Sequence, residues 1–288
     1  MTASTMRDGG SLRPLPNRPD TLTPESGTGQ VWTSGDAYEP YVGRWSRRVA
    51  APFLDWIGAP PGLRWLDIGC GTGALSQTIL ASAEPGLVRG VDPSPAFVAH
   101  ASAQVTDPRV SFQIADAMAL PFERASFDVC VSGLVLNFVP DAWDAVTEMR
   151  RVTSGSGLIG AYVWDYAGEM QMLRHFWSAA GELDSTAVEL DEGARFNLCR
   201  PAELRRCFEE SGLSEVDVTN LDIHTVFRDF DDYWQPFLGG QAPAPAYLAS
   251  LDGEARARLR ELVQSRLPIA ADGSIALLAR AWAVKGRS

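Results

Sequence analysis

The chain is predicted to adopt an α/β fold built on a mostly parallel sheet, because three observations agree. From Arg64 onward, short apolar runs of strand length alternate with helical stretches, as expected when crossover helices join parallel strands. RWLDIGCGTG, residues 64–73, carries one such run directly into three closely spaced glycines. The chain is also long enough, since 288 residues of which 45% are hydrophobic can bury one full core.

The expected elements follow one another along the chain. An amphipathic helix is expected after Pro40, within DAYEPYVGRWSRRVAAPFLDWI, where aromatic and aliphatic residues recur at helical spacing. Strands are expected at 64–68, 87–91, 110–114, 127–132 and 157–163. Helices are expected at 73–82, 95–104 and 141–151, with Pro140 placed in the first turn of the last one.

The second half of the chain departs from this rhythm. Residues 165–198, rich in Met, Trp and Phe, are expected to be helical, and RPAELRRCFEESGL is expected to form a helix that ends at Gly212. A strand at 215–221, a helix at about 252–266 and a final strand in SIALLARAWAVKG complete the elements. We interpret 165–198 and 222–272 as lid insertions in one domain, 35–288; a separately folding second domain is the alternative.

Composition excludes several classes of function. The net charge is −11, so no basic face for nucleic acid is expected. No apolar run reaches the roughly 18–20 residues of a membrane helix, and the N-terminus lacks the apolar core of a secretory signal, so no membrane association and a cytoplasmic location are expected. The cysteines show no CxxC spacing, and no metal site is expected. Residues 1–34 are predicted to be a disordered leader, because they contain almost no bulky apolar side chains.

The glycine-rich turn is compatible with several classes of ligand, because it brings backbone amides close to a bound group at the start of a helix. Gly69, Gly71 and Ala74 fit the permissive dinucleotide fingerprint G-x-G-x-x-A. The Lys-Ser/Thr pair of a phosphate-binding loop is missing, so a nucleoside triphosphatase is not expected. Asp67 opposes a pyrophosphate, because like charges about 4 Å apart cost roughly 1–4 kcal/mol, and it favours a cation such as an amino-acid ammonium.

Asp92 adds a second constraint on the ligand. It ends the next expected strand 19 residues after Gly73, the distance at which an acidic side chain in this architecture reaches a ribose diol. Together with Asp67, it predicts a ligand in which a nucleoside is joined to an amino acid.

The motifs around these residues carry a family resemblance. LDIGCGTG, GVDPS and IADAMALPFERASFDVCVSGLVLNFV resemble, in order and spacing, the four motifs of the class I S-adenosylmethionine-dependent methyltransferases. The resemblance covers residues 64–139. It implies a doubly wound, Rossmann-like sheet of seven strands, six parallel and one antiparallel, whose final strand lies beside the fifth, and it implies S-adenosylmethionine as the cofactor.

The same resemblance implies a role for each matched residue. Three groups would hold the methionine, the ribose and the adenine in turn: Asp67, Gly69, Cys70 and Gly71; Asp92 and Pro93; Asp116 and Ala117. Leu136 and Asn137 would lie between cofactor and acceptor. YEPYVGRWS is similar to a segment that precedes the first motif in many small-molecule members, where Tyr38 and Tyr41 would cover the methionine end and Arg44 would pair with its carboxylate.

Each of these residues also has a purely structural interpretation. Asp67 could orient the turn, Asp92 could be an ordinary turn residue, and Asp116 could cap a helix. Arg44 could be a solvated helix residue, and Cys70 a small apolar side chain of the core. The order and spacing of four motifs together favour the cofactor site.

The reaction places few demands on side chains. Methyl transfer from a sulfonium is an in-line displacement that needs the acceptor atom about 3–3.5 Å from the methyl carbon. A base is needed only where the acceptor must lose a proton. The candidate catalytic residues follow the fifth expected strand: His175 as a general base, with Asp165 and Tyr166 as further candidates. A polar position on a lid helix is the alternative for His175.

The expected acceptor is a small apolar or aromatic molecule. Large apolar side chains in the two insertions would enclose it, although a plain core is their alternative: Trp164, Tyr166, Met170, Met172, Phe176, Trp177 and the segment DYWQPFLGG. The expected function is therefore methyl transfer to oxygen, nitrogen or carbon of a small organic molecule. The alternatives are a non-catalytic binder of adenosylmethionine or adenosylhomocysteine whose lids associate with another protein and, more distantly, a nicotinamide-dependent oxidoreductase.

Overall fold

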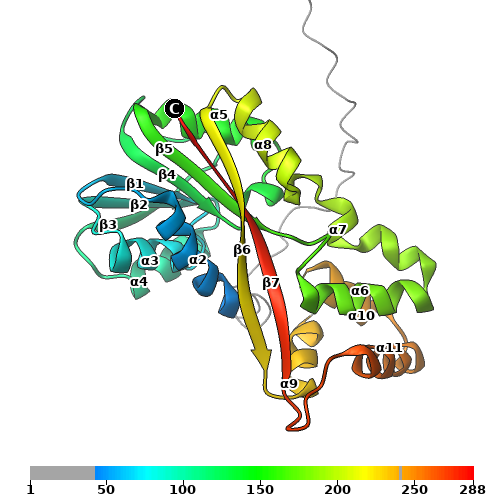
Figure 1. Cartoon of the computed structure of the whole chain (residues 1–288). Coiled ribbons are helices and arrows are strands. Elements are labelled where there is room, and N and C mark those ends of the chain that lie inside the picture. The colour runs from blue at the N-terminus through cyan, green and yellow to red at the C-terminus, as the bar shows by residue number, and fades with distance from the viewer. Residues whose placement is uncertain (1–42, 240–241) are drawn as a thin grey trace, which may run out of the picture. The chain divides into compact units, whose positions relative to one another are not determined.

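A computed structural model describes residues 43–239 and 242–288 (Figure 1). The predicted leader, residues 1–34, and the candidate cofactor residues Tyr38 and Tyr41 lie outside the described residues. No helix in the described ranges is long and apolar enough to cross a membrane. In the same ranges, no three His, Cys, Asp or Glu side chains come together in a way that could hold a metal ion.

One sheet of seven strands organises the described part of the chain, in the order β3-β2-β1-β4-β5-β7-β6. Its strands are β1 (Arg64–Ile68), β2 (Leu87–Asp92), β3 (Val110–Ile114), β4 (Phe127–Gly133), β5 (Thr153–Trp164), β6 (Ser214–Phe227) and β7 (Ile275–Arg287). The first five strands pair in parallel, whereas β7 is antiparallel to both β5 and β6. The predicted mixed sheet, with one antiparallel strand beside the fifth, is therefore confirmed.

Helices connect the parallel strands, as the alternating pattern predicts. α3 (Ala74–Ser82) connects β1 to β2, α4 (Pro95–Gln104) connects β2 to β3 and α5 (Ala142–Val152) connects β4 to β5. Of the other helices, α2 (Arg44–Ile57) precedes β1 and α8 (Pro201–Glu210) precedes β6. The predicted place of Pro140 in the first turn of α5 is wrong, because Asp141 is the N-cap and accepts hydrogen bonds from the amides of Trp143 and Asp144. Gly212 follows α8 with a φ of 83°, the left-handed conformation expected after a helix end.

Strand β6 is longer than the sequence predicts. It continues to Phe227, so the second insertion begins after that residue rather than at 222. Along its second half, buried Leu221, Ile223, Thr225 and Phe227 alternate with exposed residues. The exposed residues between them, Asp222, His224 and Val226, therefore form the solvent-facing side of a regular strand.

The second half of β6 and the first half of β7 form a two-stranded ribbon that extends beyond β5 (Figure 1). Register pairing of β7 with β5 covers 281–287, whereas pairing with β6 continues to Ile275. Four helices lie around the extended part of the ribbon: α6 (Gln171–Leu183), α9 (Phe230–Trp234), α10 (Pro243–Ser250) and α11 (Gly253–Arg266).

The aromatic side chains of these helices pack against one another. The rings of Phe176 and Phe237 stack with centroids 4.6 Å apart, and the hydroxyl of Tyr233 donates to the carbonyl of Met172 over 2.7 Å. Phe176, Tyr233 and Phe237 are each fully buried. In this structure these side chains therefore form a core that attaches the insertions to the ribbon, which is the plain-core alternative named above.

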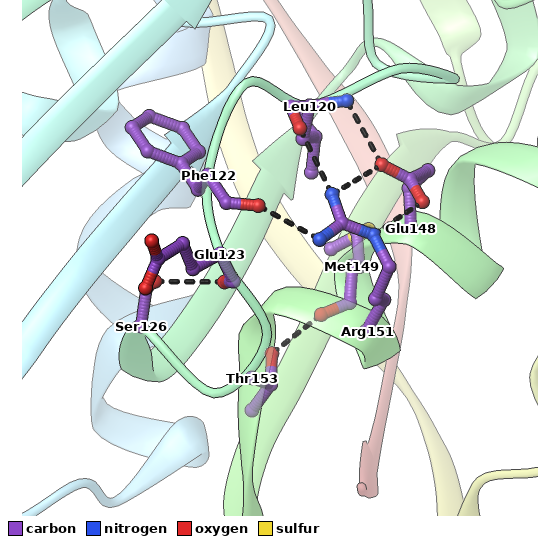
Figure 2. A network of polar contacts seen from close by, with 8 residues as sticks. All are labelled: Leu120, Phe122, Glu123, Ser126, Glu148, Met149, Arg151 and Thr153. Carbon is purple, nitrogen blue, oxygen red and sulfur yellow. Dashed lines mark hydrogen bonds and ion pairs between the residues drawn. The ribbon is translucent and has the colours of Figure 1, made fainter.

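Arg151, near the end of α5, fixes the long connection from β3 to β4 (Figure 2). Its guanidinium pairs with Glu148 through two bonds of 2.7 Å and donates to the carbonyls of Leu120, over 2.9 Å, and Phe122, over 2.7 Å. The amide of Leu120 in turn donates to Glu148 over 2.9 Å. The segment that follows Asp116 is thus tied to α5 by charge-assisted bonds.

Candidate cofactor and active site

The glycine-rich turn and the end of β2 form one hydrogen-bonded unit. The amides of Gly69 and Cys70 both donate to the carbonyl of Val91, over 2.8 and 2.9 Å. The amide of Gly71 donates to Oδ2 of Asp92 over 3.0 Å. These three amides thus have acceptors within the chain: those of Gly69 and Cys70 hold the turn against β2, and that of Gly71 orients the Asp92 carboxylate.

Close packing explains why glycine is needed in this unit. Gly69 has a φ of 70°, and a Cβ there would lie 2.5 Å from the side chain of Val135. On β2, a Cβ at Gly90 would lie 2.4 Å from the ring of Phe112 and 3.1 Å from Cβ of Cys70. Both glycines permit approaches that no other residue could make. Cys70 is buried in this packing, and burial raises the pKa of its thiol.

Asp67 lies near the end of β1 with only 1% of its surface exposed. Its Oδ2 accepts a hydrogen bond from the hydroxyl of Ser76 over 2.6 Å, while its Oδ1 is buried without a partner in the described part of the chain. Burial raises the pKa of this carboxyl group to about 7, and the charge of Asp92 adds to the effect. An unpartnered buried carboxylate oxygen fits a ligand that brings a cation, as the ammonium of S-adenosylmethionine does.

Asp92 ends β2 and is also buried. Besides Gly71, it accepts a hydrogen bond at Oδ1 from the amide of Ser94 over 2.9 Å. Burial raises the pKa of its carboxyl group, whereas the two amide bonds lower it. The two amides fix the direction of the carboxylate, and Pro93 follows it at the exposed start of the next turn. Asp92 is therefore both a turn residue and a rigid acceptor.

Asp116 and Ala117 follow β3, next to Asp92 in the sheet. Asp92 pairs in register with Ile114, and its carbonyl accepts from the amide of Ala115 over 3.2 Å. The Asp116 side chain is exposed and accepts at Oδ1 from the amide of Met118 over 2.9 Å. Asp67, Asp92 and Asp116 thus lie at or just beyond the carboxyl ends of the adjacent strands β1, β2 and β3, where ligands of such folds bind.

Leu136 and Asn137 belong to a short 3-10 helix, η2 (Leu136–Phe138), that follows β4. Leu136 is buried in the core. The amide group of Asn137 is different, because its Nδ2 and Oδ1 are both buried and neither has a hydrogen-bond partner within the described ranges. Leu134, which precedes η2, has a φ of 63°, an uncommon conformation for a residue with a side chain.

Arg44, at the start of α2, has a carboxylate partner within the chain. Its Nη1 donates to Oδ1 of Asp232 over 3.1 Å, and its guanidinium lies over the rings of Trp45 and Phe227. It is therefore not simply a solvated helix residue. Its Nε and Nη2 are buried without partners in the described ranges, so a second acceptor can still be bound. The predicted pairing with the cofactor carboxylate stays a prediction.

The three candidate catalytic residues occupy different surroundings. Asp165 follows β5, and its two oxygens each accept an amide hydrogen bond of 3.0 Å, from Gly168 and Glu169, so its carboxylate organises a turn. Tyr166 is buried, with its ring 5.4 Å from that of Phe196. His175 is half-buried on α6, and burial lowers its pKa. Their catalytic roles stay predictions.

Sequence reasoning missed two residues that complete the site. Ser76 donates to Asp67 from the first turn of α3, and Val135 packs on Gly69 from the segment after β4. A serine nine residues after the strand-end aspartate was visible in the sequence, but nothing in its local pattern showed that it turns toward the strand. The contact of Val135 depends on strand order, which local periodicity does not contain.

Comparisons with known proteins agree with this geometry. Residues 66–160 match a family model described as a methyltransferase domain. The chain is 32% identical over 186 residues to the 2-methyl-6-phytyl-1,4-hydroquinone methyltransferase of Synechocystis sp., a match that covers 63% of this chain and 57% of that protein's length. It is 28% identical over 205 residues to the demethylmenaquinone methyltransferase of Staphylococcus aureus, covering 65% and 83% of the two chains.

A solved structure shares the fold. The phosphoethanolamine N-methyltransferase 2 of Haemonchus contortus, in complex with S-adenosyl-L-methionine, superposes with a TM-score of 0.54 at 19% identity. The superposition covers 87% of this chain and 56% of that one. At this identity the likeness concerns the architecture of the sheet and its helices.

Proposed function

Because the chain belongs to the class I S-adenosylmethionine-dependent methyltransferases, whose cofactor is S-adenosylmethionine, we propose that it transfers a methyl group to a small organic acceptor. The observation that carries the proposal is Oδ1 of Asp67, near the end of β1, which is buried and has no hydrogen-bond partner among residues 43–239 and 242–288. A nicotinamide dinucleotide would bring a pyrophosphate to this carboxylate, whereas S-adenosylmethionine brings an ammonium. The site therefore favours the methyl donor.

We assign each part of the cofactor to a residue at the carboxyl end of a different strand. Asp67 would pair with the ammonium, the fixed carboxylate of Asp92 would accept from the ribose hydroxyls, and Asp116 would face the adenine. S-adenosylmethionine, when bound, supplies an activated methyl group on its sulfonium. The chain then needs to hold the acceptor in line with that methyl group and to exclude water, and positioning alone can supply much of the rate.

For the acceptor, we propose an apolar aromatic molecule bearing oxygen substituents. The printed names of two relatives, from Synechocystis and Staphylococcus aureus, specify 2-methyl-6-phytyl-1,4-hydroquinone and demethylmenaquinone. The strongly acidic chain, with a net charge of −11, is also poorly suited to a polyanionic acceptor. The methylated atom is left open between carbon and oxygen.

A transfer assay tests the proposal. The purified protein is incubated under argon with methyl-labelled S-adenosylmethionine and 1,4-dihydroxynaphthalene, and label is counted in the organic extract. We expect label in the extract with wild-type protein and with Asp128→Asn, a variant at the opposite end of β4, and less label with Asp67→Asn when S-adenosylmethionine is below saturation. Tight binding of S-adenosylhomocysteine without transfer to a panel of phenols and quinols would instead support the non-catalytic binder.

A further inference from the structure

Three aromatic rings line up beyond the carboxyl ends of β4 and β5. Phe138 on η2 meets Phe196 edge to face, with ring centroids 5.3 Å apart. Phe196 in turn lies 5.4 Å from Tyr166, the second residue after β5. Phe138 is 39% exposed, whereas Tyr166 is buried. The rings form an aromatic wall, Phe138–Phe196–Tyr166, with its exposed end next to Asn137.

A buried contact holds the middle ring of the aromatic wall in place. Phe196 follows α7 (Glu192–Arg195), whose Glu192 is buried and accepts a hydrogen bond from the indole of Trp177. Gly193 lies so close to the turn after β5 that a Cβ there would be 2.9 Å from the carbonyl oxygen of Tyr166. The segment α7 is thus packed tightly against the turn after β5, which places the ring of Phe196 beside that of Tyr166.

The amide of Asn137 is fixed at the other end of the aromatic wall. Leu134, just before η2, is held by a hydrogen bond of 2.7 Å from its amide to the carbonyl of Tyr162, and Val135 is packed on Gly69. The backbone that carries Asn137 is therefore anchored on β5 and on the glycine turn. A buried amide whose donor and acceptor both lack partners is costly, and such groups occur where a ligand completes them.

Strand order indicates which ligand completes this amide. The residues assigned to the ammonium, ribose and adenine follow β1, β2 and β3 in that spatial order, whereas Asn137 follows β4 on the other side of β1. Adjacent strands lie about 4.8 Å apart, so β4, the strand that η2 and Asn137 follow, is about 10 Å from β2. It therefore lies beyond the amino-acid end of the cofactor, on the side from which an acceptor approaches.

We propose that Asn137 determines acceptor specificity by binding a hydroxyl group on an aromatic ring that packs against the aromatic wall. This inference rests on the proposed function and names its substrate class as hydroxylated aromatics. Oδ1 accepts a hydrogen bond from the hydroxyl group, and Nδ2 donates one to the hydroxyl oxygen or to a neighbouring carbonyl of the acceptor. An amide cannot remove the proton, so Asn137 selects and orients the acceptor without acting as a base.

The test measures binding of two matched probes to protein saturated with S-adenosylhomocysteine. The probes are 1-naphthol and 1-methoxynaphthalene, which differ in the hydroxyl donor. We expect the wild-type protein to bind 1-naphthol about tenfold more tightly or better, since a site built to bond a hydroxyl rejects analogues that lack it. Asn137→Leu should make the two affinities equal and leave the affinity for S-adenosylhomocysteine unchanged. The matched control, Asn220→Leu on the edge strand β6, should keep the wild-type preference.

A second variant separates ring packing from hydroxyl recognition. Phe138→Ala, at an exposed position, should weaken both probes by a similar factor and keep their ratio. Three results would overturn the inference: no binding of either probe to the loaded protein, a preference for 1-naphthol that survives in Asn137→Leu, or loss of S-adenosylhomocysteine affinity in that variant. Failure of the wild-type protein to bind S-adenosylhomocysteine at all would instead contradict the proposed function.

Discussion

Replacing Asp67 by Asn should stabilise the free protein and weaken cofactor binding at the same time. Burial raises the pKa of Asp67 to about 7 from its ordinary value of 3.8, so the folded chain holds a proton there that the unfolded chain has released. Between these two pH values the folded state binds more protons than the unfolded state. Its stability therefore falls as the pH rises from about 4 to 7.

The size of the effect follows from the shift. A change of about three pKa units corresponds to about 4 kcal/mol, so at pH 8 the free Asp67→Asn protein should be more stable than wild type by up to that amount. The difference should disappear toward pH 4. Asn can still accept the hydrogen bond from Ser76, so the variant does not remove that contact.

Binding should change in the opposite direction. The ammonium of the cofactor selects the ionised form of Asp67, so wild-type affinity should fall about tenfold for each pH unit below about 7. At pH 8 the Asn variant should bind more weakly by about 1.5–3 kcal/mol, the usual worth of a hydrogen bond to a charged group. Protonation of the ligand's own groups affects both proteins equally. The ratio of the wild-type and variant affinities at each pH therefore reports the ionisation of Asp67 alone.

Calorimetric titration with S-adenosylhomocysteine and thermal unfolding, both from pH 5.5 to 8.5, measure these changes. Asp128→Asn is the matched control, because Asp128 pairs with Arg64 at the start of the strands and should not alter affinity. The assignment of Asp67 to the ammonium is refuted if Asp67→Asn binds as tightly as wild type at pH 8, or if the affinity ratio does not change with pH.

Further variants test other parts of the structure. Asp92→Ala should weaken S-adenosylhomocysteine binding by roughly 2–4 kcal/mol in calorimetry, because two hydrogen bonds to the ribose are lost, and unchanged affinity would remove Asp92 from the ribose. Arg151→Ala should lower the free energy of unfolding in urea by roughly 2–3 kcal/mol, and an unchanged midpoint would show that its network adds no stability. If His175 is the general base, His175→Ala should turn over more slowly than wild type while its cofactor affinity is unaltered. Turnover equal to that of wild type from pH 6 to 9 would dismiss that role.

The cofactor half of the proposed site can be proposed from the sequence because its residues lie close together along the chain. Asp67, the glycines and Asp92 lie in two short strands and one turn, where each residue's position follows from its distance to a strand end. The strands expected at 64–68 and 110–114 have those same limits in the structure. Patterns of this kind need no knowledge of how distant segments pack.

The proposed acceptor half depends on long-range contacts that periodicity cannot contain. Phe138 and Phe196 are far apart in sequence, and only the packing of α7 against the turn after β5 brings their rings together. The aromatic residues of the insertions were expected to enclose an acceptor, yet Phe176 and Phe237 stack in a core instead. Composition alone does not distinguish the lining of a pocket from the filling of a core.

The extended ribbon of β6 and β7 holds the helical insertions away from strands β1 to β4, so the insertions can vary independently of those strands. The second insertion leaves from β6 and returns to β7 at the far end of this ribbon, and the first, which begins after β5, contacts β7 through a bridge between Met170 and Ala279. The registers among β1, β2, β3 and β4 are set entirely by other residues. Helices can therefore be lengthened, shortened or exchanged at the far end of the ribbon without realigning the strands that bear the three aspartates. Such an arrangement allows new substrate preferences to evolve on an unchanged donor-binding framework.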